Sequence, residues 1–272
     1  EESGIPRRWI DQFNRELDLV TVVSRYVAKV LADSGLRTPI AVVGNGAEHF
    51  TDTATPSDRE PHDHLPPRDG RFRFLHVSSG FPRKGVDCLI EAWGRAFTKA
   101  DLVCLVLKTF PNPHNDVALQ VAALGRRFPD HAEIVLIEAD LDKSSIAGLY
   151  RGCDALVMPS RGEGFGLPAA EAMLAGLPVI ATNHGGLREF CNDATAWLVD
   201  YRFARAQSHI GVFDSAWVEP DVDDLARALR ALWTAPPAER QARSQAARIL
   251  VERVFTWPAV ARRTEAAVAT LA

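Results

Sequence analysis

The stretch that decides the fold runs from Ala155 to Met173 and reads ALVMPSRGEGFGLPAAEAM. Its first four residues, Ala155–Met158, are all apolar, which is the pattern of a strand buried on both faces. A glycine-rich loop follows. Pro168 then suits the first turn of a helix, where its fixed φ fits and its missing N–H would have no partner anyway. We therefore predict a strand, a loop and a helix in that order, the repeating unit of a parallel sheet.

The same alternation continues in both directions along the chain. Helical patterns, for example over residues 86–97 and 116–128, separate short apolar runs. The predicted strands are Phe72–Val77, Leu102–Leu107, Ile134–Ile137, Ala155–Met158, Val179–Ala181 and Ala196–Val199. Continuous apolar strands separated by helices are typical of a parallel sheet that is covered on both faces. The sequence thus predicts an α/β chain with a Rossmann-like, doubly wound parallel sheet.

The pattern also divides the chain into parts. Two short strand candidates, Leu19–Val23 and Ile40–Val43, flank a helix that Ser24 can cap. Residues 47–71 then lack hydrophobic periodicity and are rich in Thr, Pro, Asp and His, which indicates a linker. We predict a first unit over 1–46, a linker over 47–71, the main domain over 72–256 and a last helix over 257–272.

Composition excludes several classes of protein. A net charge of -4 gives no general attraction to nucleic acid or to anionic lipid, so any phosphate binding must be local. No apolar run approaches the roughly 20 residues of a membrane span, and the first residues lack the pattern of a signal peptide. The four cysteines form no C-x-x-C pair, as expected for reduced thiols. We expect a cytoplasmic protein that does not bind nucleic acid.

Ligands of an open parallel sheet bind beyond the carboxyl ends of the strands, and glycine-containing loops are predicted there. The loop after Phe72–Val77 carries Arg83 and Lys84 beside a helix start, which suits either an anion site or a solvated basic turn. The loop after Ala155–Met158 places the backbone N–H groups of Gly164–Leu167 at a helix N-terminus. Such a helix start can hold a diphosphate.

Two carboxylates flank that second loop. Glu163 lies within it, and Glu171 follows about one turn inside the helix. Like charges repel, so neither side chain suits a phosphate, but both suit the hydroxyl groups of a ribose and a sugar. The alternative is that Glu163 caps the helix and Glu171 faces solvent, which the neighbouring glycines make a weaker interpretation.

The chain also contains matches to two other known motifs. Residues 164–169 fit the dinucleotide fingerprint G-x-G-x-x-A, which would indicate an NAD-linked oxidoreductase, but they follow a late strand rather than the first. Asp140–Asp142 and Asp221–Asp223 fit the metal-binding pattern Asp-x-Asp, yet each precedes a predicted helix that it can cap. We therefore assign neither a metal nor a cofactor.

The run from Met158 to Glu189 resembles the donor-binding signature of glycosyltransferase family 4, whose members are retaining enzymes with the two-domain GT-B fold. The shared pieces are a Pro-Ser pair after a strand, EGFGLP with a second Glu eight positions after the first, AGLPVIAT, and GGxxE. The resemblance extends to PRKG at residues 82–85 and to VGNG at residues 43–46. It covers nearly the whole chain.

This resemblance implies roles for individual residues. Lys84 would neutralise the donor diphosphate, Glu163 would contact the transferred sugar, and Glu171 would bind the ribose hydroxyls. The backbone of the glycine loop would contribute to diphosphate binding, and the loop after Ile134–Ile137 would border the nucleobase. The remaining donor-binding residues implied in this way are Gly164, Phe165, Gly166, Leu167, Glu138, Asp140 and Leu141.

The chain departs from the family pattern in two respects. The family often has a diphosphate-binding Arg six positions before the Lys; Ser78 stands there instead, and Arg83 is the candidate substitute. In addition, only about 46 residues precede the linker, so we expect this chain to hold only the end of the acceptor domain of a GT-B enzyme. The helix over 257–272 resembles the one that returns to that domain.

The resemblance implies a metal-independent, retaining hexosyltransferase of polysaccharide biosynthesis. Its substrates would be a nucleotide-diphospho-sugar donor and a glycan or lipid-linked acceptor. The full-length protein could associate peripherally with a membrane through its other domain. For this chain by itself we expect donor binding with little or no sugar transfer, and a noncatalytic sugar-nucleotide-binding module is the main alternative.

Overall fold

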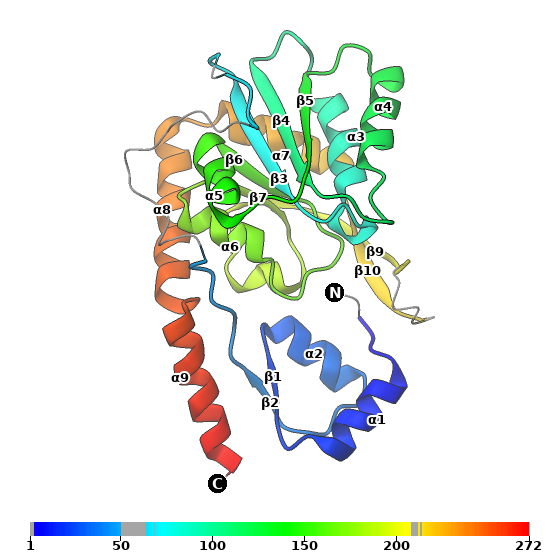
Figure 1. Cartoon of the computed structure of the whole chain (residues 1–272), viewed down its shortest axis with the longest axis vertical. Coiled ribbons are helices and arrows are strands. Elements are labelled where there is room, and N and C mark those ends of the chain that lie inside the picture. Colours follow the sequence, from blue (N-terminus) through cyan, green and yellow to red (C-terminus); the bar gives the residue numbers. More distant parts are fainter. Residues whose placement is uncertain (1–2, 50–63, 68, 208–211, 213, 272) are drawn as a thin grey trace.

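The computed structural model describes residues 3–49, 64–67, 69–207, 212 and 214–271, and its main body is a six-stranded parallel sheet (Figure 1). The strands are β3 (Phe72–Val77), β4 (Val103–Thr109), β5 (Glu133–Glu138), β6 (Ala155–Met158), β7 (Val179–Thr182) and β8 (Trp197–Val199). They lie in the order β5-β4-β3-β6-β7-β8. The chain builds outward from β3 to β5 and then returns to β6, so the order reverses between β3 and β6, where ligands of such sheets bind. The predicted fold class is confirmed.

Helices cover both faces of this sheet, as the sequence predicts. One face packs against α5 (Lys143–Gly152), α6 (Leu167–Leu174) and α8 (Pro237–Val254). The other packs against α3 (Val86–Ala96), α4 (Val117–Arg127) and α7 (Val222–Thr234). Two separate apolar layers result. Figure 1 shows the sheet with helices on both of its sides.

A smaller unit precedes the sheet in the chain. It contains α1 (Arg7–Glu16), β1 (Val20–Val22), α2 (Arg25–Asp33) and β2 (Ile40–Val42), with β1 and β2 paired in parallel. Ser24 caps α2, as predicted, because its hydroxyl accepts a hydrogen bond from the Val27 N–H at 3.2 Å. The unit has its own apolar cluster, in which Ile10 and Leu31 are buried.

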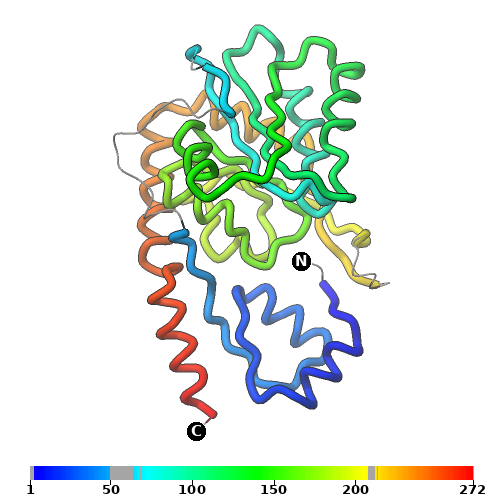
Figure 2. Tube along the Cα trace, viewed as in Figure 1, coloured from blue at the N-terminus to red at the C-terminus, as the bar shows by residue number. Residues whose placement is uncertain are grey.

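The last long helix, α9 (Trp257–Val268), runs from the sheet domain beside this smaller unit (Figure 2). Its Arg263 Nε donates a hydrogen bond to the Val43 carbonyl at 2.7 Å. Thr256 caps the helix through the Ala259 N–H at 3.4 Å, so it begins one residue before Pro258. The predicted linker over 47–71 is described only at residues 47–49, 64–67 and 69–71; its remainder lies outside the described residues.

The sequence did not predict two elements. One is α1, and the other is the antiparallel hairpin of β9 (Tyr201–Arg205) and β10 (Ala216–Pro220). The segment of β9 has five residues, two of them arginines, and three are exposed, so it lacks the continuous apolar run by which the buried strands are recognised. Short one-turn helices also occur, among them η2 (Pro82–Lys84), η3 (Gly185–Glu189) and η4 (Ala269–Leu271). Within the part of the chain that is described, no helix has both the length and the apolarity of a membrane span.

Two leucines that differ in burial should contribute very differently to the free energy of unfolding. Leu75 in β3 is 0% exposed, whereas Leu119 in α4 is 73% exposed. We expect Leu75→Ala to lower the free energy of unfolding by about 2–5 kcal/mol, since it leaves a cavity in the core. The matched change Leu119→Ala should cost less than about 0.5 kcal/mol. Urea denaturation of the two variants measures this, and equal losses would show that β3 does not carry the core.

Candidate functional site

A buried arginine joins the loops that follow β3 and β6. Arg161 is 7% exposed, and its two terminal nitrogens donate to the Asp87 carboxylate at 2.7 and 2.6 Å. One of them also donates to the Pro82 carbonyl at 2.5 Å, while Nε donates to Glu219 at 2.8 Å. The backbone N–H of Arg161 donates to the Arg83 carbonyl at 2.8 Å. A planar guanidinium with this many acceptors holds the two loops in one relative position.

This clamp brings the two predicted catalytic residues into contact. Lys84 Nζ lies 2.6 Å from Glu163 Oε1, and both side chains are nearly buried, at 12% and 8% exposure. The Ser160 hydroxyl donates to the same oxygen at 3.1 Å, and the nearest Arg83 nitrogen is 3.7 Å away. Two cations thus surround one carboxylate, which leaves a net positive charge where the sequence predicts a diphosphate.

The glycines of the β6–α6 loop allow very close backbone packing. Gly166 precedes α6 with φ of +94°, and a Cβ there would lie 2.4 Å from a side-chain carbon of Leu187. A Cβ on Gly186 would lie 2.1 Å from the Gly164 carbonyl oxygen. The Gly186 N–H also donates to the Glu163 carbonyl at 2.8 Å. The loop after β7 therefore supports the loop after β6, and only glycine fits at these contacts.

Two further residues of the β6–α6 loop, Phe165 and Gly164, contact distant parts of the chain. Phe165 is 5% exposed, and its ring packs edge-on against Phe190 and Phe255, so only its backbone is available to a ligand. The Gly164 carbonyl accepts a hydrogen bond of 2.5 Å from the Ser24 hydroxyl. The N-terminal unit thus touches the glycine loop directly.

Glu171 lies deep in the site, at 9% exposure. The Tyr150 hydroxyl donates to its Oε2 at 2.9 Å, and His49 Nδ1 lies 3.5 Å from its Oε1. Burial raises the pKa of Glu171 to about 7, and the hydrogen bond from Tyr150 opposes this only in part. Burial makes the charged form of Glu171 unfavourable. Further hydrogen bonds from a ligand to this carboxylate would therefore stabilise it.

Ser78, which stands where the family often has an arginine, belongs to an internal network. Its Oγ lies 2.8 Å from His76 Nε2 and accepts from the Gly80 N–H at 3.2 Å. His76 Nδ1 lies 2.8 Å from the Val157 carbonyl, so Nδ1 carries the proton and Nε2 accepts from Ser78. Burial lowers the pKa of His76 to about 4, which keeps the ring neutral. The pair fixes the loop after β3 but adds no positive charge.

The predicted nucleobase border lies at the end of β5. Glu138 accepts a hydrogen bond from the Asn115 side chain at 3.2 Å, and Asn112 donates to the Ser79 carbonyl at 2.8 Å. The loop after β4 is thereby tied to both neighbouring loops. Asp140 is exposed, and Leu141 packs against the core on the α5–α6 side.

Several of these residues were not singled out from the sequence: Arg161, Tyr150, His76, Asn112 and Asn115. For the two asparagines a signal was present, since polar residues directly after an apolar strand lie at the edge where ligands bind. The two formal Asp-x-Asp motifs do cap helices. Asp142 accepts from the Ser145 N–H, and Asp221 from the Asp224 N–H, both at 2.8 Å. In the residues that the structure places, no three His, Cys, Asp or Glu side chains are arranged to hold a metal ion.

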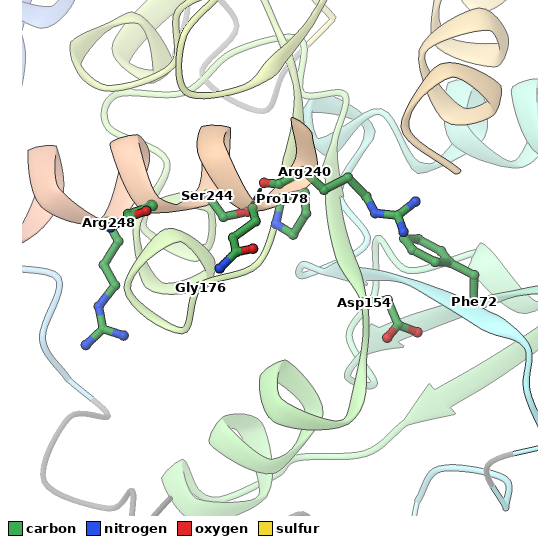
Figure 3. Close-up of a pocket in the computed structure, with 9 residues that line it drawn as sticks. Phe72, Asp154, Gly176, Pro178, Arg240, Ser244 and Arg248 are labelled. Atoms are coloured by element: carbon green, nitrogen blue, oxygen red, sulfur yellow. Dashed lines mark hydrogen bonds between the residues drawn. The ribbon is translucent and has the colours of Figure 1, made fainter. Parts of the chain in front are cut away.

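Two cavities are lined by other residues than Lys84, Glu163 and Glu171. One, of about 540 Å³, opens at the amino ends of β3, β6 and β7, where Arg240 stacks at 5.3 Å over the Phe72 ring (Figure 3). That is the edge of the sheet opposite to the glycine loops. The other, of about 440 Å³, lies between α2 and η3 and is lined in part by Tyr26, His184 and Tyr201. Arg25, Arg188 and Glu189 also line this cavity, and burial lowers the pKa of His184.

A family model described as family 4 glycosyltransferase in conflict systems matches residues 14–264. The chain belongs to glycosyltransferase family 4. The resemblance found in the EGFGLP region is thus confirmed. Among curated relatives of this glycosyltransferase chain, an MMP alpha-(1→4)-mannosyltransferase of Mycolicibacterium hassiacum is 33% identical over 204 residues, which are 74% of this chain and 44% of the relative. A D-inositol 3-phosphate glycosyltransferase of an Arthrobacter species is 36% identical over 136 residues, 48% of this chain and 31% of the relative.

Solved structures show the same fold. A sucrose-phosphate synthase of Thermosynechococcus elongatus gives a TM-score of 0.75 at 22% identity, covering 97% of this chain and 61% of that one. The Anabaena protein HepE, solved in complex with UDP-glucose, gives a TM-score of 0.75 at 19% identity, with 97% and 66% covered. The chain therefore spans less than half of the length of those two curated relatives and about two thirds or less of each of these two structural neighbours.

The raised pKa of Glu171 predicts a pH-dependent contribution to stability. The folded chain holds this proton up to a pKa of about 7, against 4.5 for a free carboxyl, so the added stability is fully present below pH 4.5 and is lost as the pH rises through 7. Relative to Glu171→Gln, the wild type should lose about 2–3 kcal/mol of unfolding free energy between pH 4.5 and pH 8. Urea denaturation of both proteins across this range measures the loss. A difference that does not vary with pH would contradict it.

Proposed function

We propose that this chain holds the donor site of a retaining glycosyltransferase, which transfers a hexose from a nucleotide-diphospho-sugar to a glycan or lipid-linked acceptor. The observation that carries the proposal is the contact of Lys84 with Glu163 beside the N-terminus of α6, with Glu171 buried on the same helix. Positive charge for a diphosphate and two carboxylates for hydroxyl groups thus lie at one edge of the sheet. The UDP-glucose complex of the structural neighbour HepE supports this assignment.

In the proposed reaction, Lys84 stabilises the departing diphosphate. Before the donor binds, its charge is compensated by Glu163 at 2.6 Å. The donor phosphates bring additional negative charge, and the ammonium group can bind them while it stays close to Glu163. The backbone N–H groups and the dipole at the start of α6 add to this stabilisation. Charges that are fixed in advance around a leaving group lower the barrier without reorganising during the reaction.

The two carboxylates would serve the neutral parts of the donor. Glu163, held by Lys84 and Ser160, would contact hydroxyl groups of the transferred sugar, and Glu171 would accept from the ribose. Ionised acceptors form strong hydrogen bonds with hydroxyl donors. Because Glu171 is costly to keep charged without partners, the ribose would supply the hydrogen bonds that its buried position lacks.

The proposal extends to the setting of the reaction. All four cysteines are buried free thiols, which supports a reducing compartment and hence the cytoplasm. Transfer to glycan or lipid-linked acceptors would place the protein in polysaccharide biosynthesis. The full-length protein would associate peripherally with a membrane through its other domain. The diphosphate would be neutralised by Lys84, Arg83 and the start of α6, so the reaction would need no divalent metal.

Removing the Glu171 carboxylate, which is proposed to bind the ribose, should weaken nucleotide binding. We expect Glu171→Ala to reduce affinity for a nucleoside diphosphate by about 1.5–3 kcal/mol, the range for hydrogen bonds to charged groups. Glu265→Ala, a change of the same kind on the exposed face of α9, should have no effect. Isothermal titration with UDP, GDP and ADP compares the three proteins. Unchanged affinity in Glu171→Ala would rule out its role at the ribose.

Binding should also be independent of metal. With two cationic side chains and a helix N-terminus beside the diphosphate, we expect the dissociation constant for the best nucleoside diphosphate to change less than about twofold on adding EDTA. The measurement is a titration in EDTA, with added magnesium and with added manganese. A strict requirement for either ion would point to the Asp140 or Asp221 region instead.

A further inference from the structure

A buried lysine in β4 has no role in the donor site described above. Lys108 is 6% exposed, and its Nζ lies 5.6 Å from the centre of the Phe110 ring. Among the residues that the structure describes, its side chain forms no hydrogen bond and no ion pair. Burial lowers the pKa of Lys108, and the negative charge of Asp140 opposes this shift. The ammonium group carries three N–H donors, so a ligand that supplies an acceptor at this position can bind it.

The strand register places Lys108 at the ligand-binding edge. It is paired with Val77 of β3 and with Ile137 of β5, and its carbonyl accepts from the Ser78 N–H at 3.0 Å. Lys108 therefore lies between the loop that carries Lys84 and the loop that carries Asp140.

Its side chain lies on the face of the sheet that α5 and α6 cover. Side chains alternate along a strand, and Cys104 and Val106, the two preceding residues on the same face, belong to the apolar layer of α5 and α6. Tyr150 and Glu171, the proposed ribose-binding pair, lie on that same side. A nucleotide whose diphosphate is at Lys84 and whose ribose is at Glu171 would extend its base toward Lys108 and Asp140.

This inference rests on the proposed function and names the donor's base. We propose that Lys108 and Asp140 bind the Watson–Crick edge of guanine, so that the donor is a guanosine-diphospho-sugar. The Lys108 ammonium group would donate to O6, and the two oxygens of Asp140 would accept from N1–H and the N2 amino group. All of these contacts are charge-assisted hydrogen bonds.

The other bases match this pair less well. Uracil offers one carbonyl for the lysine and one N–H for the aspartate, but its second carbonyl then faces the remaining carboxylate oxygen. Adenine and cytosine present an amino group to the lysine and a ring acceptor to the aspartate, so that donors meet donors and acceptors meet acceptors. The expected order of affinity is guanine, then uracil, then adenine and cytosine.

The test compares GDP, IDP, UDP and ADP as ligands of the whole chain by isothermal titration. IDP keeps O6 and N1–H but lacks the N2 amino group, so the wild type should bind GDP about tenfold more tightly than IDP. Lys108→Met should weaken GDP and IDP alike by about tenfold or more, because both carry O6. Asp140→Ala should bring the ratio of GDP to IDP affinity close to one.

Two matched variants serve as controls. Lys99→Met and Asp130→Ala alter exposed residues in the segments that precede β4 and β5, at the opposite edge of the sheet. Neither should change any affinity. Lys108→Met removes a buried charge and should not lower the melting temperature, which separates a loss of binding from a loss of folding.

The outcomes also separate this inference from the proposed function. If UDP or ADP binds as tightly as GDP, or if Asp140→Ala leaves the ratio of GDP to IDP unchanged, the guanine inference is wrong. The proposed donor site still stands in that case, provided that Glu171→Ala weakens the nucleotide that binds. If no nucleoside diphosphate binds, both fail.

Discussion

The candidate site depends on one interaction, the buried guanidinium group of Arg161. It joins the loop after β3 to the loop after β6 and to the hairpin strand β10, through Asp87, Pro82 and Glu219. Arg161 and Asp87 are 74 residues apart in the chain. The guanidinium group thus adds to the backbone hydrogen bond from the Arg161 N–H to the Arg83 carbonyl, which joins the same two loops. With this clamp, Lys84 and Glu163 meet at a fixed distance before any ligand arrives.

Burial then determines how the charged groups of the site behave. Glu163 has cations and a hydroxyl group around it, whereas Glu171 has a tyrosine hydroxyl and a histidine. Two acids of the same sequence motif therefore differ in environment: one is balanced by charge, and the other has its pKa raised to about 7. Lys108 is a third case, in which a buried cation has an acid nearby but no direct partner. Such groups are frequent at ligand sites, because ligands complete their interactions.

Backbone packing sets the shape of the same site. The loop after β7 approaches the glycine loop so closely that a Cβ on Gly186 would overlap the Gly164 carbonyl. The N-terminal unit reaches the same loop through the hydroxyl of Ser24, and Arg25 of α2 pairs with Glu189 of η3 at 3.2 Å. The loop after β6 is thus held from both sides, which would restrict the positions of a diphosphate in the proposed donor site.

The sequence by itself determined the sheet, the loops at its carboxyl edge and the acids within them. Strands β3 and β6 have the predicted bounds, because a short segment rich in apolar residues that ends at serine, glycine or proline is a local signal. The hairpin of β9 and β10 was missed because β9 is short and carries two arginines, so its sequence has no continuous apolar run. Only the tertiary structure decided that Arg161 is a clamp rather than a ligand-binding cation, that Lys84 meets Glu163, and that Lys108 is buried beside Asp140. Each of these facts depends on side chains from distant segments, and the pairing of a charge depends on what surrounds it in space rather than along the chain.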